Sequence, residues 1–235
     1  MMRNWIDTHV HLLYPNRLQY PWALNIPTLN QSFHLEHYQQ VAAPLGITQA
    51  LHMEVDVPEA LIEEETKLIG ELIQQPNSLL VGAISSCRPE KKDMGLFIES
   101  AMNNPLIHGF RRVLHVVPDD VSTSDTFRQN IRALTRKGHS FDICVLPSQM
   151  HLAVALAKAC PNTQFVLDHC GVPAVAEHNM APWKSQITSI AKLPNVVCKI
   201  SGLIAYGDIR RWLPGDIQSI VDDLRPYVEH AIDCF

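Results

Sequence analysis

Two histidines stand two positions apart near the start of the chain, His9 and His11, at the end of an apolar segment that begins at Asn4. Alternate residues of a β-strand share a face, so Asp7, His9 and His11 are expected to project together from the end of a strand. Paired imidazoles can ligate a divalent metal, or can hydrogen-bond a carbonyl without one. Two surface histidines at this spacing also arise by chance, so their meaning depends on the fold.

A second histidine, His169, ends the apolar run that starts at Phe165, and a glycine follows at position 171. If the run is a strand, His169 shares a face with Leu167 and Phe165 and points inward with them. The alternative is a core histidine whose hydrogen bonds are internal. Placement at the end of a strand favours a functional role.

Charged residues mark the ends of other apolar runs. Glu54 follows such a run and is either a site residue or a solvated loop acid. Arg111 and Arg112 are adjacent, so strand alternation sends one inward and one toward the helices. Arg111 shares a face with the small Gly109, and we therefore expect Arg111 to face the substrate.

Lys199 and Ser201 share a face near the end of the last apolar run. A buried lysine needs an anionic or hydrogen-bonding partner. Lys199 is therefore expected either to bind substrate or to pair with a carboxylate of the protein.

Apolar segments of strand length alternate with segments of helix length throughout the chain. The strand candidates are residues 4–9, 48–55, 78–85, 107–114, 140–146, 164–169 and 195–201. The helix candidates are residues 34–44, 58–75, 90–103, 124–137, 148–160, 183–193 and 215–232. Regular alternation predicts an α/β fold with a parallel sheet, and the lack of a glycine-rich turn after the first strand favours a (β/α)8 TIM barrel over an open sheet. The active site of such a barrel lies at the carboxyl ends of its strands.

Composition narrows the class of protein. A chain of 235 residues with 46% hydrophobic and 18% charged residues can form one barrel domain over residues 1–235. A net charge of −5 argues against a nucleic-acid partner. The six cysteines form no C-x-x-C pair, and no segment has the length of a membrane span or an apolar signal, so a cytoplasmic protein with reduced thiols is expected.

The chain resembles the amidohydrolase-related (amidohydrolase 2) family, which includes L-fuconolactonase and other lactone hydrolases with a TIM-barrel fold. The resemblance is carried by segments spread over most of the chain, namely residues 6–11, 53–57, 87–90, 109–115, 140–144, 167–173 and 195–203. It implies a hydrolase of a sugar lactone or related cyclic ester, hence a role in carbohydrate metabolism. It also implies that His9, His11 and His169 surround the substrate carbonyl or a metal, with Arg111 and Arg112 among the substrate contacts.

Several expectations remain open beside this one. If a metal binds, one Zn²⁺ is the first choice for imidazole ligands, although lactone opening without a metal is also compatible with the resemblance. A metal-dependent decarboxylase of the same superfamily is the alternative enzyme. Only seven strands are counted, and the Gly-Ser-Asp-Trp-Pro type motif expected on an eighth strand does not occur, so a C-terminally truncated barrel that binds without catalysing is a third reading. Such a barrel has unpaired edges, which a homo-oligomer would cover.

Overall fold

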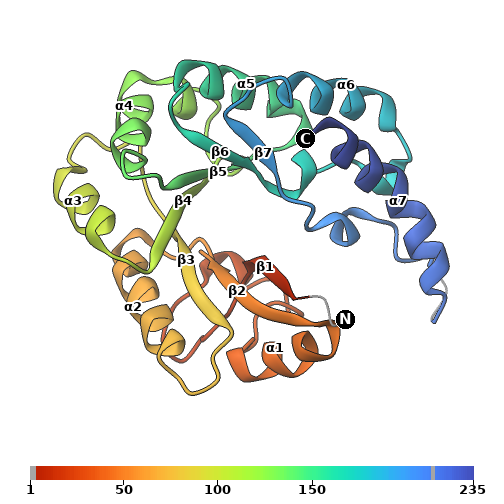
Figure 1. Ribbon diagram of the computed structural model, residues 1–235, viewed down its shortest axis with the longest axis horizontal. Coiled ribbons are helices and arrows are strands. Elements are labelled where there is room, and N and C mark those ends of the chain that lie inside the picture. Colours follow the sequence, from red (N-terminus) through yellow and green to blue (C-terminus); the bar gives the residue numbers. More distant parts are fainter. Residues whose placement is uncertain (1–3, 213–214) are drawn as a thin grey trace. The chain divides into compact units, whose positions relative to one another are not determined.

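The computed structural model describes residues 4–212 and 215–235. Seven strands lie in chain order, from β1 to β7, and each is followed by a helix (Figure 1). The strands are β1 (Trp5–Val10), β2 (Ile47–Met53), β3 (Leu80–Ser86), β4 (Ile107–Val113), β5 (Ser140–Cys144), β6 (Gln164–Leu167) and β7 (Val196–Cys198). The helices are α1 (Leu35–Ala42), α2 (Ile62–Ile73), α3 (Gly95–Asn103), α4 (Asp125–Leu134), α5 (Met150–Ala159), α6 (Met180–Ile190) and α7 (Ile217–Cys234).

The predicted alternation is confirmed, since every strand and helix candidate overlaps the corresponding element. The last two strands are shorter than expected: β6 ends at Leu167 and β7 at Cys198. His169, Lys199 and Ser201 therefore lie in the loops that follow these strands, where strand alternation no longer fixes the direction of a side chain.

The chain divides into two compact units, and the boundary falls within β4, between Arg111 and Arg112. Unit 1 comprises residues 4–88 and 93–111 of the described chain. In it β1 pairs with β2, β2 with β3 and β3 with β4, all in parallel. Its core combines strand residues such as Val10, Ala50 and Ala83 with Ile69 of α2. Helices α1, α2 and α3 belong to this unit (Figure 1).

Unit 2 comprises residues 89–92, 112–212 and 215–235 of the described chain. Its strands β5, β6 and β7 pair in parallel, and α5, α6 and α7 follow one another beside them (Figure 1). Phe127 of α4, Phe141 of β5 and Phe165 of β6 are fully buried. Their rings meet edge to face with centroids 6.1 Å apart at both contacts, an arrangement that aromatic pairs favour. This stack packs α4 against the strands that carry the polar residues of unit 2.

All six cysteines are free thiols, and four of them are buried, so they act as small core residues. Within the described residues, no helix combines the length and the apolar character needed to cross a membrane.

Candidate active site

The end of β1 departs from a regular strand. Asp7 pairs with Ala50 of β2 while Val10 pairs with His52, so β1 contains one more residue than β2 between these positions. This bulge breaks the alternation on which the shared face of Asp7 with the histidines was predicted. The Asp7 carboxylate instead accepts hydrogen bonds from the Tyr38 hydroxyl of α1 and from the His9 backbone N–H, both at 3.0 Å.

The rings of His9 and His11 nevertheless meet. Their Nε2 atoms lie 3.2 Å apart, and the rings are nearly perpendicular, at 82°. His11 Nδ1 lies 3.1 Å from the carbonyl oxygen of Met53. A carbonyl only accepts, so Nδ1 carries the proton, and the lone pair of neutral His11 is on Nε2, toward His9.

His11 is held in its neutral form. Desolvation lowers its pKa well below the usual range, followed by the positive charge of Arg111 and then by His9 and His52. A neutral imidazole with Nδ1 occupied by a backbone carbonyl presents Nε2 as a ligand or an acceptor.

The two Nε2 atoms fit a single divalent metal ion. Two imidazole nitrogens bound about 2.0–2.1 Å from one tetrahedral Zn²⁺ lie about 3.3–3.4 Å apart. The 3.2 Å between His9 and His11 is close to this separation, and the proton on His11 Nδ1 leaves its Nε2 available. The prediction that His169 is a third ligand stays a prediction.

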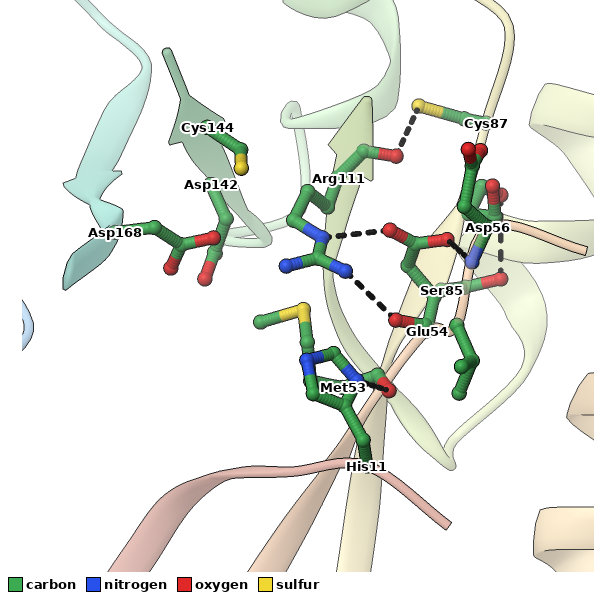
Figure 2. A network of polar contacts seen from close by, with 12 residues as sticks. His11, Met53, Glu54, Asp56, Ser85, Cys87, Arg111, Asp142, Cys144 and Asp168 are labelled. Atoms are coloured by element: carbon green, nitrogen blue, oxygen red, sulfur yellow. Dashed lines mark hydrogen bonds and ion pairs between the residues drawn. The ribbon is translucent and has the colours of Figure 1, made fainter. Parts of the chain in front are cut away.

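A buried ion pair stands beside this pair of histidines in unit 1. Arg111 Nε donates to Glu54 Oε1 at 2.6 Å, and its Nη2 donates to the Glu54 carbonyl at 2.7 Å (Figure 2). Both residues are almost inaccessible, at 4% and 1% exposure. The second oxygen of Glu54 accepts from the Asp56 backbone N–H at 2.7 Å. Glu54 is therefore a buried ion-pair partner and not a solvated loop acid.

Arg88 links the loop after β2 to the loop after β3 through hydrogen bonds. Arg88 donates to the Val57 carbonyl at 3.1 Å and to Asp56 at 3.4 Å, and its other amino group donates to Ser86 Oγ at 2.7 Å. Asp56 has a positive φ of 45°, a conformation that costs energy in a non-glycine residue. Arg88 helps to hold the loop in that conformation.

Arg112 has a different partner from its neighbour. Within unit 2 its Nε and Nη2 donate to Glu90 Oε1 at 3.0 and 2.9 Å. Arg111 and Arg112 thus have separate carboxylate partners, and which of the two points inward stays a prediction. Their contacts with a substrate stay predictions.

Lys199 forms the centre of a buried charged group in unit 2. Its ammonium pairs with Asp142 of β5 and lies 3.8 Å from Asp168, which follows β6. Asp142 and Asp168 are 0% and 1% exposed. Of the two predicted roles for Lys199, pairing with carboxylates of the protein is the one these contacts support.

His169 lies on a left-handed turn. Four successive residues have positive φ, from His169 at 54° through Cys170 at 51° and Gly171 at 67° to Val172 at 55°. Left-handed backbone costs about 1–2 kcal/mol for each non-glycine residue, so the surrounding structure must hold this turn. The inference that His169 points inward because it shares a strand face with Leu167 was wrong in its reasoning, since the strand has ended before it.

Three residues beside the predicted site residues were not singled out from the sequence. Arg88 and Asp168 contact residues far along the chain. Gly202 lies so close to the His169 ring that a Cβ on it would be 2.6 Å from Nδ1. For Arg88 and Asp168 one signal was present, since each is a charged residue that follows an apolar strand. No local pattern distinguishes Gly202 from a glycine in an ordinary turn.

Comparison with known proteins places this arrangement in a family. Residues 6–235 match the family model described as amidohydrolase. An L-fucono-1,5-lactonase of Burkholderia multivorans is 26% identical, with 97% of this chain and 75% of that protein aligned.

Two solved structures are similar to this chain over almost its whole length. A crystal structure of an amidohydrolase from Burkholderia multivorans with bound zinc has a TM-score of 0.82 and 21% identity, covering 99% of this chain and 81% of that chain. A probable 2-pyrone-4,6-dicarboxylic acid hydrolase from Acinetobacter baumannii has a TM-score of 0.73 and 15% identity, covering 98% and 79%. These likenesses confirm the TIM-barrel fold class predicted from the strand and helix alternation.

Proposed function

This chain belongs to the amidohydrolase family, and from that membership we propose that it hydrolyses a lactone, with water attacking a ring carbonyl held at His9 and His11. The names of two similar proteins support a cyclic ester as the class of substrate. One is named as a fucono-1,5-lactonase and another as a probable hydrolase of a pyrone dicarboxylic acid, and both of these substrates are cyclic esters.

The observation that carries the proposal is the contact between the two Nε2 atoms. They converge at 3.2 Å at the carboxyl end of β1, the end at which barrel enzymes bind their substrates. His11 cannot turn its Nε2 away without losing the bond from its Nδ1 to Met53. His11 is therefore held in place before a substrate arrives, and such preorganisation favours electrostatic catalysis.

The same atoms support a metal site. His9 and His11 would hold one divalent ion, with Zn²⁺ as the first choice for imidazole ligands. Such an ion polarises a carbonyl and lowers the pKa of water. The residues of the chain supply the rest: Met53 fixes the tautomer of His11, and the charge of Arg111 disfavours protonation of its ring.

The charges around the strand ends support an uncharged substrate. Arg88 and Arg111 of unit 1 pair with Asp56 and Glu54, so neither cation is left to balance a negative substrate. In unit 2 the same holds for Arg112, which pairs with Glu90, and for Lys199, which pairs with Asp142 and Asp168. In either unit, a substrate with two carboxylates would have to compete with the protein's own carboxylates for these cations, which opposes its binding. A sugar lactone carries no such charge.

A panel of lactones tests the proposal. A pH-stat records the acid released from an uncharged sugar 1,5-lactone and from 2-pyrone-4,6-dicarboxylate, with and without added Zn²⁺, after subtraction of spontaneous opening. We expect hydroxy-acid formation from the sugar lactone, with kcat/KM at least about tenfold above that for the dicarboxylate.

Three results would count against parts of this proposal. No opening of any lactone, with or without Zn²⁺, would contradict the lactonase function itself. Preference for the dicarboxylate would contradict the charge argument and leave the reaction class intact. Release of carbon dioxide from a carboxylated substrate would identify a decarboxylase instead.

A further inference from the structure

The loop that follows β7 forms a support for the His169 ring within unit 2. Ser201 Oγ lies 2.9 Å from His169 Nδ1. Gly202, next in the chain, has a φ of +68°, and a Cβ placed on it would lie 2.6 Å from Nδ1 and 2.9 Å from the ring Cγ. The ring therefore rests against the backbone of Gly202, where any larger residue would displace it.

The backbone that carries His169 is fixed independently of this support. The Cys170 N–H donates to the Lys199 carbonyl at 3.1 Å, and the indole of Trp183 donates to the Cys170 carbonyl at 2.7 Å. These two bonds tie the left-handed turn to the loop after β7 and to α6. What they leave undetermined is the rotation of the imidazole and which of its nitrogens carries the proton.

Ser201 and Gly202 are placed to influence both of these. The close approach of the Gly202 backbone limits the rotation of the ring, and the hydroxyl of Ser201, which can donate or accept, pairs with Nδ1. With Nδ1 occupied, Nε2 is the nitrogen that can face a substrate. The arrangement matches that of His11, where a backbone carbonyl receives the Nδ1 proton.

We propose that Ser201 and Gly202 are positioning residues for His169, with Nδ1–H donating to Ser201 Oγ and Gly202 providing the space in which the ring lies. This inference rests on the proposed function for the importance of His169 in catalysis. The placement of the ring and of its proton does not depend on that function and can be measured by itself.

Three variants test the proposal, namely Ser201→Ala, Ser201→Thr and Gly202→Ala, with Ser148→Ala and Gly138→Ala as matched controls. Ser148 is exposed. Gly138 has a positive φ of +86°, like Gly202, but a Cβ on it would meet nothing within 4 Å. Two readouts are needed: the ¹⁵N shifts of the His169 ring, which report the tautomer, and kcat and KM for a sugar lactone.

In the unmodified protein we expect the Nδ1–H tautomer of His169. Ser201→Ala should give a mixture of tautomers and lower kcat about 10–100-fold, the usual loss when the partner of a functional histidine is removed, with little change in KM. Ser201→Thr keeps the hydroxyl and should restore both readouts. Gly202→Ala should shift the ring signals and lower kcat at least as much, while the controls change neither readout.

The proposal is overturned if His169 carries its proton on Nε2 in the unmodified protein, or if Ser201→Ala leaves the tautomer unchanged. It is equally overturned if Ser201→Ala and Ser201→Thr lower kcat to the same extent. If no lactone is opened by the unmodified protein, the proposed function fails while the tautomer measurement still decides on Ser201. Urea denaturation of each variant distinguishes a moved ring from a protein that has not folded.

Discussion

The two units hold their candidate site histidines in different ways. In unit 1, His11 follows the last residue of β1 directly, and the carbonyl of Met53 at the end of β2 contacts its ring. In unit 2, His169 lies beyond its strand on a left-handed turn, and a side-chain hydroxyl contacts its ring. A backbone partner is independent of residue type, whereas the support of His169 needs a hydroxyl at 201 and a glycine at 202. Substitutions at the residues that contact the His169 ring should therefore be tolerated less well than substitutions at the residue whose carbonyl contacts the His11 ring.

The buried ion pairs of the two units also differ, in the number of carboxylates that each cation contacts. In unit 1 one arginine meets one carboxylate, Arg111 with Glu54. In unit 2 one lysine serves two buried carboxylates, Asp142 and Asp168. Removing the cation takes a positive partner from one buried carboxylate in the first case and from two in the second, and breaking a buried ion pair is costly.

The largest effect is expected for Lys199→Met in unit 2. It should lower the free energy of unfolding by about 5 kcal/mol, the upper end for a broken buried ion pair, because two carboxylates lose their partner. Urea denaturation followed by circular dichroism measures it, with the exposed Lys192→Met as control. A loss no greater than that of the control would show that Lys199 does not hold Asp142 and Asp168.

A smaller loss, about 3 kcal/mol, is expected for Arg111→Met in unit 1, because only Glu54 is left unpaired. The double variant Glu54→Leu with Arg111→Met should recover most of this loss, since replacing both partners by apolar residues removes the buried charge altogether. The same denaturation experiment compares the two. Additive losses in the double variant would contradict the ion-pair interpretation.

The smallest effect concerns the bulge in β1. Tyr38→Phe removes one hydrogen bond to Asp7 and should cost about 1 kcal/mol. Zn²⁺ binding measured by calorimetry should not change, because the hydrogen bond from the His9 backbone N–H to the other oxygen of Asp7 stays in place. A weaker affinity for Zn²⁺ in this variant would place Asp7 in the site after all.

The sequence was sufficient for the elements of both units and for part of unit 1. Alternation of apolar segments located all seven strands, and the charged residues at strand ends identified Glu54 and Arg111, whose contact follows from the pairing of β2, β3 and β4 in order. These inferences need only the periodicity of a strand and the geometry of a parallel sheet.

Where the backbone departs from a regular strand, the sequence did not predict the local structure. The run from Phe165 to His169 reads as one strand, yet it leaves the sheet at Leu167 and continues through non-glycine residues with positive φ. Such a turn is set by distant anchors, among them Trp183, which local propensity does not reveal. The bulge before Val10 is hidden in the same way, because it depends on the register with β2.

The pair formed by His9 and His11 is the central element of the proposed function, and the rate of lactone opening by the double variant His9→Ala with His11→Ala tests it most directly. The control is His37→Ala, an exposed histidine of α1 in the same unit. On the sugar lactone that the unmodified protein opens fastest, we predict a loss in kcat of about 10²-fold or more for the double variant and no loss for the control, with both variants folded by circular dichroism. A double variant that opens the lactone as fast as the control would contradict the account.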